Sequence, residues 1–270
     1  MKKPRTLVVL SDLHAGSVVA LMPPTFVTAN EQEVKQNALQ AWYWKCWIKS
    51  LEWIDEVIGQ DPAALLLNGD LIEGDHHRTT EIISRDIGDH IEIARLLLKP
   101  LAQRFQKTFI TRGTECHTGN VEGALGKLIG AELNPETDKP VFDRLTLDIC
   151  GVRLIARHHV STTSRPWLEG NGLGMELAAE QLHAVRNGEP MPKVLCVAHR
   201  HVAGHYQGGE GLCLATPAWQ GMTRHTFKVV PAARCKTGVY ILDWRGVEDG
   251  CLPRVHRKLF EAPHAKAITI

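Results

Sequence analysis

The chain has 270 residues, of which 44% are hydrophobic and 23% are charged, and its formal net charge is +1 at pH 7. This composition is ordinary for a soluble globular protein, and the near-zero charge excludes a strong overall field that would attract nucleic acid or an anionic membrane. The seven cysteines are scattered and form no CxxC pair, which argues against a disulfide framework and a structural zinc knuckle and favours a cytoplasmic setting.

Apolar runs and helical patterns predict the elements in chain order. Thr6–Leu10 and Ala63–Leu67 are continuous apolar runs, typical of strands that are buried on both faces. A helical pattern rich in tryptophan, which we expect to pack in the core, extends from 31 to about 59, and a second pattern extends from 86 to 105. Pro100 should kink or break the second helix. Further strands are expected at 108–111, 145–149, 152–156, 194–198, 212–215 and 238–242, and further helices at 121–130 and 173–185.

The order of these elements predicts the fold class. Strands and helices alternate early in the chain, whereas hairpins dominate later, which indicates an α/β protein with a mixed sheet or a two-sheet sandwich flanked by helices. The sequence contains no internal repeat, no linker and no apolar stretch long enough to span a membrane. We therefore expect one domain over residues 1–270 and no membrane partner.

Polar side chains follow the carboxyl ends of the predicted strands. Ligand sites of α/β sheets gather beyond these strand ends, so residues that are far apart in sequence converge there. The candidates are Asp12, His14, Asp70, Thr114, Glu115, His117, His158, His159, His199 and His201.

The residue types in this set predict a metal centre. Carboxylate and imidazole ligands together suit Mn, Fe or Zn better than Mg or Ca. Six or seven ligands are too many for one tetrahedral ion but suit two ions, which can activate a bridging hydroxide and neutralise phosphate oxygens. We therefore expect two divalent metal ions as cofactors, with Mn favoured, and hydrolysis of a phosphoester substrate.

The order of the motifs resembles the calcineurin-like metallophosphoesterases, whose pattern is D-x-H, G-D-x-x, G-N-H-[DE], a histidine and G-H-x-H. The resemblance covers residues 7 to 201, and it implies a two-sheet α/β sandwich and a metal-dependent phosphodiesterase, nuclease or phosphatase. The matching segments are Asp12-Leu13-His14, Gly69-Asp70-Leu71-Ile72-Glu73, Gly113-Thr114-Glu115-Cys116-His117, His158-His159 and Ala198-His199-Arg200-His201.

The resemblance also implies a role for each ligand. Asp12, His14 and His201 would bind the first metal, and Asp70 would bridge both metals. The second metal would take His199 and one of two neighbouring histidines, of which His158 is preferred over His159 because it lies closer to the strand end.

The third motif departs from the family pattern, because the asparagine that usually ligates the second metal is missing. Glu115 is the anionic replacement that we expect, while Thr114 stands directly after the glycine but offers only a neutral hydroxyl. His117 would protonate the leaving group as general acid, or it would bind the metal instead.

Four residues beside the motifs are candidates for substrate binding. His76 and His77 would line the substrate cleft, although a solvated loop explains them equally well. Arg112 and Arg200 could each bind a phosphate group, although a surface salt bridge is at least as good an explanation.

Two questions about function stay open in the sequence. It contains no long basic stripe with interleaved aromatic residues, so it does not decide between a small monoester and a phosphodiester such as nucleic acid. The altered third motif also leaves room for a different role, in which a metal-binding scaffold that has lost catalysis recruits a protein partner. A two-metal hydrolase of amides or esters is a third hypothesis, which the motif order disfavours.

Overall fold

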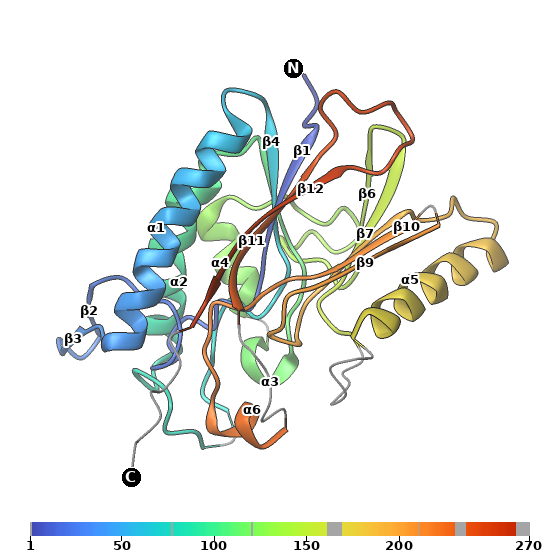
Figure 1. Cartoon of the computed structure of the whole chain (residues 1–270). Helices are drawn as coiled ribbons and strands as arrows, with labels where there is room; N and C mark the ends of the chain where they lie inside the picture. Colours follow the sequence, from blue (N-terminus) through green and yellow to red (C-terminus); the bar gives the residue numbers. More distant parts are fainter. Residues whose placement is uncertain are drawn as a thin grey trace, which may run out of the picture.

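The computed structural model describes residues 2–76, 78–119, 121–160, 169–209, 211–229 and 236–262. Two five-stranded sheets pack face to face, and helices lie on their outer sides (Figure 1). The first sheet has the order β12-β11-β1-β4-β5 and the second has the order β6-β7-β8-β10-β9. The two-sheet mixed sandwich that the sequence predicts is therefore the fold of this chain.

The strand bounds are as follows. The first sheet contains β1 (Thr6–Leu10), β4 (Ala63–Leu67), β5 (Lys107–Ile110), β11 (Lys236–Asp243) and β12 (Arg254–Glu261). The second sheet contains β6 (Leu145–Ile149), β7 (Val152–Ala156), β8 (Val194–Val197), β9 (Gly204–Gly208) and β10 (Gly211–Ala215), and a small separate hairpin contains β2 (Thr25–Val27) and β3 (Glu33–Lys35).

Parallel pairing brings several strand ends together in each sheet. Strands β1, β4 and β5 are parallel neighbours in the first sheet, and β7, β8 and β10 are parallel neighbours in the second. The remaining neighbours in both sheets are antiparallel. The loops that follow β1, β4 and β5 therefore leave one edge of their sheet together, as do the loops that follow β7 and β8.

Side-chain alternation divides the core into layers. Leu7 and Val9 of β1 belong to the cluster between the two sheets, whereas Val8 and Leu10 face the helices. The outer face of the first sheet is covered by α1 (Ala38–Ile58), α2 (Ile87–Ala102) and α4 (Val121–Ile129). The outer face of the second sheet is covered by α5 (Glu169–Arg186), and the two short helices are α3 (Glu115–Thr118) and α6 (Arg224–Val229).

Helix α1 begins later than the sequence pattern predicts. Residues 33–35 form β3, and the helix begins at Ala38 because Asn37 caps it. The Asn37 side chain accepts a hydrogen bond from the Gln40 backbone N–H at 2.9 Å, and the Gln40 side chain accepts one from the Asn37 N–H at 3.1 Å. The expected role of the helix is correct, because Trp47 is buried in the core and the tryptophans at 42, 44 and 53 pack against it.

Helix α2 includes Pro100, at which the sequence predicts a kink or break. The helix ends two residues after this proline, at Ala102. Proline has no N–H to donate to the carbonyl four residues earlier, and its ring crowds that carbonyl, which disfavours continuation of the helix and agrees with its end close to Pro100.

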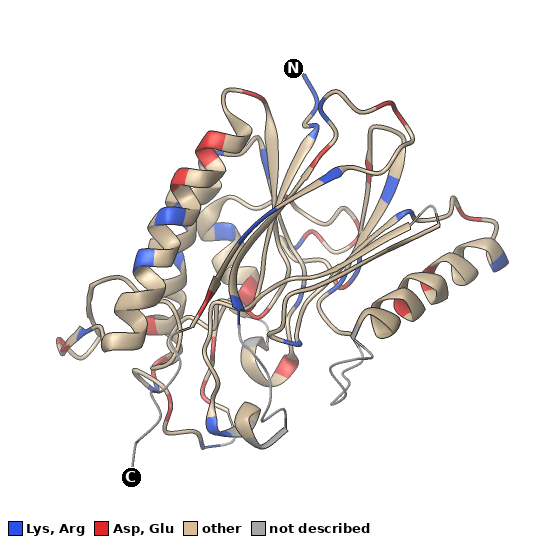
Figure 2. Ribbon diagram, viewed as in Figure 1, with Lys and Arg blue, Asp and Glu red and all other residues tan. Residues whose placement is uncertain are grey.

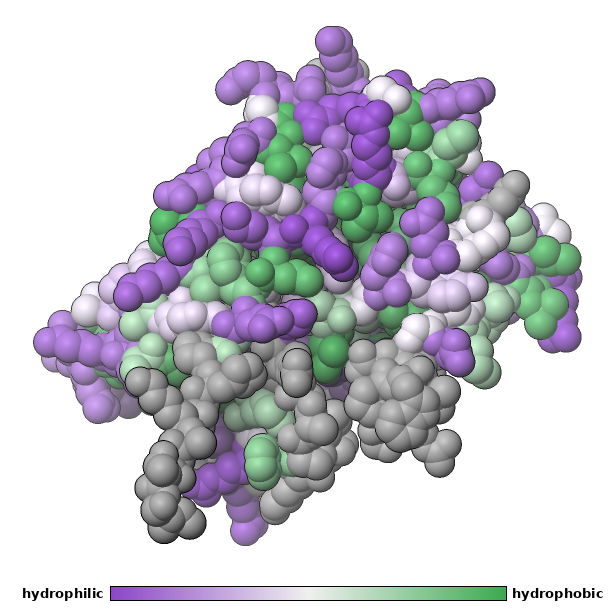
Figure 3. All heavy atoms as spheres, in the orientation of Figure 1, coloured by the Kyte–Doolittle hydropathy of each residue, from purple (hydrophilic) through white to green (hydrophobic). Residues whose placement is uncertain are grey.

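The visible surface is neither uniformly charged nor uniformly hydrophobic. Basic and acidic residues are interspersed over the elements visible in Figure 2, and the face shown in Figure 3 mixes hydrophilic with hydrophobic residues. None of the helices in the described ranges is both long and apolar enough to cross a membrane. The six cysteines in these ranges are all free thiols, and Cys235 lies outside them.

Candidate metal centre

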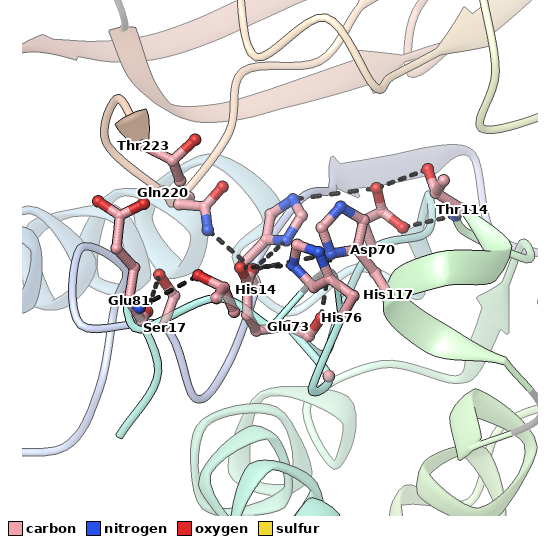
Figure 4. Close-up of polar contacts among 12 residues, drawn as sticks. His14, Ser17, Asp70, Glu73, His76, Glu81, Thr114, His117, Gln220 and Thr223 are labelled. Carbon is pink, nitrogen blue, oxygen red and sulfur yellow. Dashed lines mark hydrogen bonds and ion pairs between the residues drawn. The ribbon is translucent and has the colours of Figure 1, made fainter. Parts of the chain in front are cut away.

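Loops from both sheets meet at one place. Asp12 and His14 follow β1, Asp70 follows β4 and Thr114 follows β5, while His158 follows β7 and His199 and His201 follow β8. Backbone hydrogen bonds join the first two loops, since the Asp12 N–H donates to Gly69 O at 2.9 Å and the His14 N–H donates to Asp70 O at 2.9 Å. The described side chains of these loops make the dense set of polar contacts that Figure 4 shows in part.

The backbone at this place is strained. Nine non-glycine residues in the described ranges have a positive φ, and five of them are the clustered Asp12, His14, Asp70, His199 and His201, with φ between 46° and 68°. Left-handed backbone costs a non-glycine residue about 1–2 kcal/mol. Such strain is retained where the surrounding structure requires it, and it gathers at functional sites.

The first group of side chains consists of Asp12, His14 and His201. The Nε2 atoms of His14 and His201 face each other at 3.1 Å, and His201 Nε2 lies 3.4 Å from Asp12 Oδ1. All three side chains are buried or nearly so. One carboxylate oxygen and two imidazole nitrogens therefore converge on one small volume.

The second group consists of Asp70, His158 and His199. His158 Nε2 lies 2.9 Å from Asp70 Oδ2, and the other ring nitrogen of His158 donates a hydrogen bond to Asn68 O at 2.8 Å. Thr114 joins this group, because its Oγ1 lies 3.0 Å from Asp70 Oδ2 and 3.2 Å from His199 Nδ1.

Asp70 lies between the two groups. Its Oδ2 is 2.9 Å from His158 Nε2 in the second group and 3.9 Å from His14 Nε2 in the first. Asp12 also approaches both groups, since its Oδ1 is 4.0 Å from His158 Nε2. The two groups therefore form one continuous cluster rather than two separate sites.

The cluster fits a pair of cations. Both carboxylate oxygens of Asp12 are buried, and within the described residues neither accepts a hydrogen bond. Burial, together with the charge of Asp70, raises the pKa of Asp12 to about 6. A buried carboxylate without donors is costly unless a cation compensates it, and carboxylate with imidazole is a donor set that Mn, Fe or Zn accepts.

A third group, formed by His14, Glu73 and His117, serves as a hydrogen-bonding hub (Figure 4). Glu73 Oε2 lies 2.7 Å from His14 Nδ1 and accepts a hydrogen bond from Gln220 Nε2 at 2.8 Å, while Oε1 lies 3.1 Å from His76 Nε2. Burial would raise the pKa of Glu73, but the charge and hydrogen bond of His14 hold it well below its usual range. Because Glu73 is satisfied in this way, it orients His14 and leaves the Nε2 of that ring for the first group.

His117 lies beside the first group, with its ring 4.8 Å from the ring of His14 and 4.2 Å from that of His76. Its Nδ1 donates to the backbone O of Glu73 at 3.0 Å, which leaves Nε2 without that proton. Burial and the charge of His14 lower the pKa of His117 to about 4. Gly74 permits this approach, because its φ is +73° and a Cβ there would lie 2.2 Å from His117 O.

The structure does not bring all of the predicted residues to the cluster. Glu115 is exposed and belongs to none of the three groups of described residues. His159 is also in none of these groups, but its ring centre lies 5.1 Å from that of His158 and 5.0 Å from that of His199, at the margin of the second group. The Arg112 side chain pairs with Asp143 at 2.5 Å on the surface. Arg200 lies between His199 and His201 in the loop after β8, and its side chain is only partly buried. His77 lies outside the described residues.

Sequence reasoning missed Glu73, Gln220 and Glu122 as parts of this site. Glu73 stands three residues after Asp70, so its closeness to the second motif was the available signal. Glu122 lies in α4 and Gln220 follows β10, and no local pattern distinguishes either from a surface residue.

The comparison with known proteins finds likenesses to solved structures at low sequence identity. No protein-family model and no curated protein matches the chain. Among solved structures, it is similar to an archaeal phosphodiesterase, with 10% identity, a TM-score of 0.46, and 94% of this chain and 99% of that chain covered. It is also similar to Vps29 of Entamoeba histolytica in complex with Zn²⁺, with 11% identity, a TM-score of 0.44 and coverage of 95% and 98%. A third likeness is to the Escherichia coli phosphoesterase Yfce, with 13% identity, a TM-score of 0.43 and coverage of 88% of each chain.

Proposed function

We propose that this chain is a dinuclear metal-dependent phosphoesterase, which hydrolyses a phosphodiester or a phosphomonoester. The observation that carries the proposal is the convergence of two ligand groups around Asp12 and Asp70, where both oxygens of the buried Asp12 accept no hydrogen bond from the described residues. Two groups so close together suit a pair of divalent ions better than a single one.

The proposed ligands are divided between two ions. Asp12, His14 and His201 would hold the first ion, and His158 and His199 would hold the second. The position of Asp70 between the groups, 2.9 Å from one imidazole nitrogen and 3.9 Å from another, supports a shared role.

Thr114 is the proposed replacement for the missing asparagine of the third motif. Its Oγ1 lies 3.2 Å from His199 Nδ1 and 3.0 Å from Asp70 Oδ2, whereas Glu115 is exposed. A hydroxyl oxygen is a weaker ligand than an amide or carboxylate oxygen, so the second ion should be the more weakly bound of the two.

When bound, two divalent ions would polarise the phosphoryl oxygens and activate water for attack on phosphorus. The chain supplies the remaining parts of the reaction. Glu73 Oε2 contacts Nδ1 of His14, so that only the Nε2 atom of His14 is free to face the first ion. His117 keeps its Nδ1 proton on the Glu73 carbonyl, so it would have to take up a second proton at Nε2 before it could donate one to the departing oxygen.

The proposal is tested with metal-free protein, reloaded with Mn²⁺ and offered bis(p-nitrophenyl) phosphate and p-nitrophenyl phosphate. Turnover of at least one ester should appear with Mn²⁺ and disappear with a chelator. The Asp70→Asn variant, which removes the shared charge, should lose this turnover while keeping its fold by circular dichroism. Absence of turnover of both esters by folded protein that has bound Mn²⁺ would refute the proposal and favour the scaffold hypothesis.

A further inference from the structure

Glu122 is a buried carboxylate that the proposed chemistry does not use directly. It lies in the first turn of α4, and its side chain is on the same buried face as Leu125 and Ile129, which pack in the core. Only 1% of Glu122 is exposed. A carboxylate in this position loses its hydration, so its hydrogen-bond partners in the protein determine what it does.

The two carboxylate oxygens of Glu122 bind two different loops of the metal centre. Oε1 accepts a hydrogen bond from the Leu71 N–H at 3.2 Å, and Oε2 accepts one from the Gly113 N–H at 2.8 Å. Leu71 directly follows Asp70, and Gly113 directly precedes Thr114. One side chain therefore holds together the backbone on either side of the Asp70–Thr114 contact.

That contact is close and leaves little room for movement. The Thr114 N–H donates to Asp70 Oδ1 at 2.6 Å, and Thr114 Oγ1 lies 3.0 Å from Asp70 Oδ2. A Cβ at Gly113 would lie 2.3 Å from both the backbone N and Oδ1 of Asp70, so the loops are as near as a glycine allows. A shift of a few tenths of an ångström between the loops would therefore change how Asp70 and Thr114 face His199.

We infer that Glu122 is a positioning residue of the metal centre, which sets the spacing of Asp70 and Thr114 and thereby the affinity for the second ion. This inference rests on the proposed two-metal function. The inference requires that both carboxylate oxygens of Glu122 accept hydrogen bonds, because the Leu71 and Gly113 N–H groups each need an acceptor at the same time. Glutamine has the same shape but would turn an NH₂ group toward one of the two N–H donors.

The test compares Mn²⁺ binding by wild-type protein with binding by Glu122→Gln, Glu122→Asp and the surface control Glu136→Gln. Calorimetry gives the affinity for each ion, and the electron paramagnetic resonance signal of a spin-coupled Mn²⁺ pair reports the occupied dinuclear centre. Glu122→Gln should bind the more weakly held ion 10- to 100-fold less tightly, as is typical when the support of a ligand is removed. It should lose the coupled signal at limiting Mn²⁺ and keep the affinity for the first ion.

The outcomes separate this inference from the function on which it rests. If Glu122→Gln does not fold, the Glu122→Asp variant tests the inference instead. Its shorter side chain reaches only one of the two amides, so it should also lower the affinity for the second ion. The Glu136→Gln control should bind both ions as the wild type does. A folded Glu122→Gln or Glu122→Asp variant with two wild-type affinities overturns the positioning role. Wild-type protein that never forms a coupled pair instead overturns the proposed function.

Discussion

The Nδ1 atom of His14 lies 2.7 Å from Oε2 of Glu73, and both side chains are at most 2% exposed. A carboxylate behind a ligating imidazole fixes the ring orientation and raises its basicity. Glu73 does this while it also accepts a hydrogen bond from Gln220 and contacts His76. The first group of proposed ligands is therefore held by contacts that the motif residues alone do not supply.

Replacing Glu73 with Gln should weaken the first metal site, because the amide removes the negative charge from His14. We expect a 10- to 100-fold loss of affinity for the first ion, measured by competition with a chelating dye. Glu136→Gln, the same change on an exposed residue, should have no effect. Unchanged affinity in the folded Glu73→Gln variant would mean that His14 needs no such support.

Thr114 should determine how tightly the second ion is held. Thr114→Val keeps the shape of the side chain but removes Oγ1, which contacts both Asp70 and His199. We expect about tenfold weaker binding of the second ion, in line with the loss of one hydrogen bond to a charged group. Thr114→Asn offers an amide oxygen and should bind that ion more tightly than the wild type. Titration calorimetry measures both changes. Equal affinities for the second ion in the wild type, Thr114→Val and Thr114→Asn would show that Thr114 does not bind that ion.

His117 should affect the departing group rather than metal binding. The His117→Asn variant should retain both ions but lose kcat by about 10²–10⁴-fold on an ester with an alkoxide leaving group, which needs a proton. The loss should be much smaller with p-nitrophenolate, which leaves without one. Steady-state rates with the two esters provide the comparison, and the exposed His183→Asn variant is the control. Equal losses with both esters would contradict a role in proton transfer.

Metal-free protein should lose stability as the pH rises above neutrality. Burial would lower the pKa of His158, but its hydrogen bond to Asp70 and the charge of that residue raise it to about 9 from 6.5. The protonated ring therefore contributes stability that is fully present below pH 6.5 and is lost as the pH rises through about 9.

Urea unfolding in the presence of a chelator measures this effect. We expect the free energy of unfolding to fall by up to about 3 kcal/mol between pH 6.5 and 9. Excess Mn²⁺ should abolish the fall, since the ion replaces the proton, and His158→Gln should abolish it without metal. A flat profile for the metal-free wild type would show that His158 and Asp70 do not share a proton in this way.

Much of the fold can be predicted from the sequence because several strands are continuous apolar runs. The strands β1 and β4 are continuous apolar runs buried on both faces, and Asp12 and Asp70 follow within three residues of their ends. Strands β9 and β12 have no comparable run and were not predicted, since their side chains are only half-buried or exposed. The order of the clear elements left a mixed sheet or a two-sheet sandwich, and the resemblance to the calcineurin-like metallophosphoesterases then favoured the sandwich.

The candidate site could be predicted only in part, for a different reason. Thr114 and Glu115 were both candidates, and their separation depends on α3, which begins at Glu115 and directs that side chain outward. A helix of four residues has no periodicity that a sequence could reveal. Glu122 likewise reaches the centre only because α4 packs its apolar face on the first sheet, which is a property of the tertiary structure.

The most direct test of the dinuclear centre is the rate of bis(p-nitrophenyl) phosphate hydrolysis as metal-free protein is titrated with Mn²⁺. The two groups of ligands predict little turnover at one equivalent per chain, a steep rise toward two and a plateau beyond two. A rate that is already maximal at one equivalent, or one that does not depend on metal at all, would contradict the proposed centre.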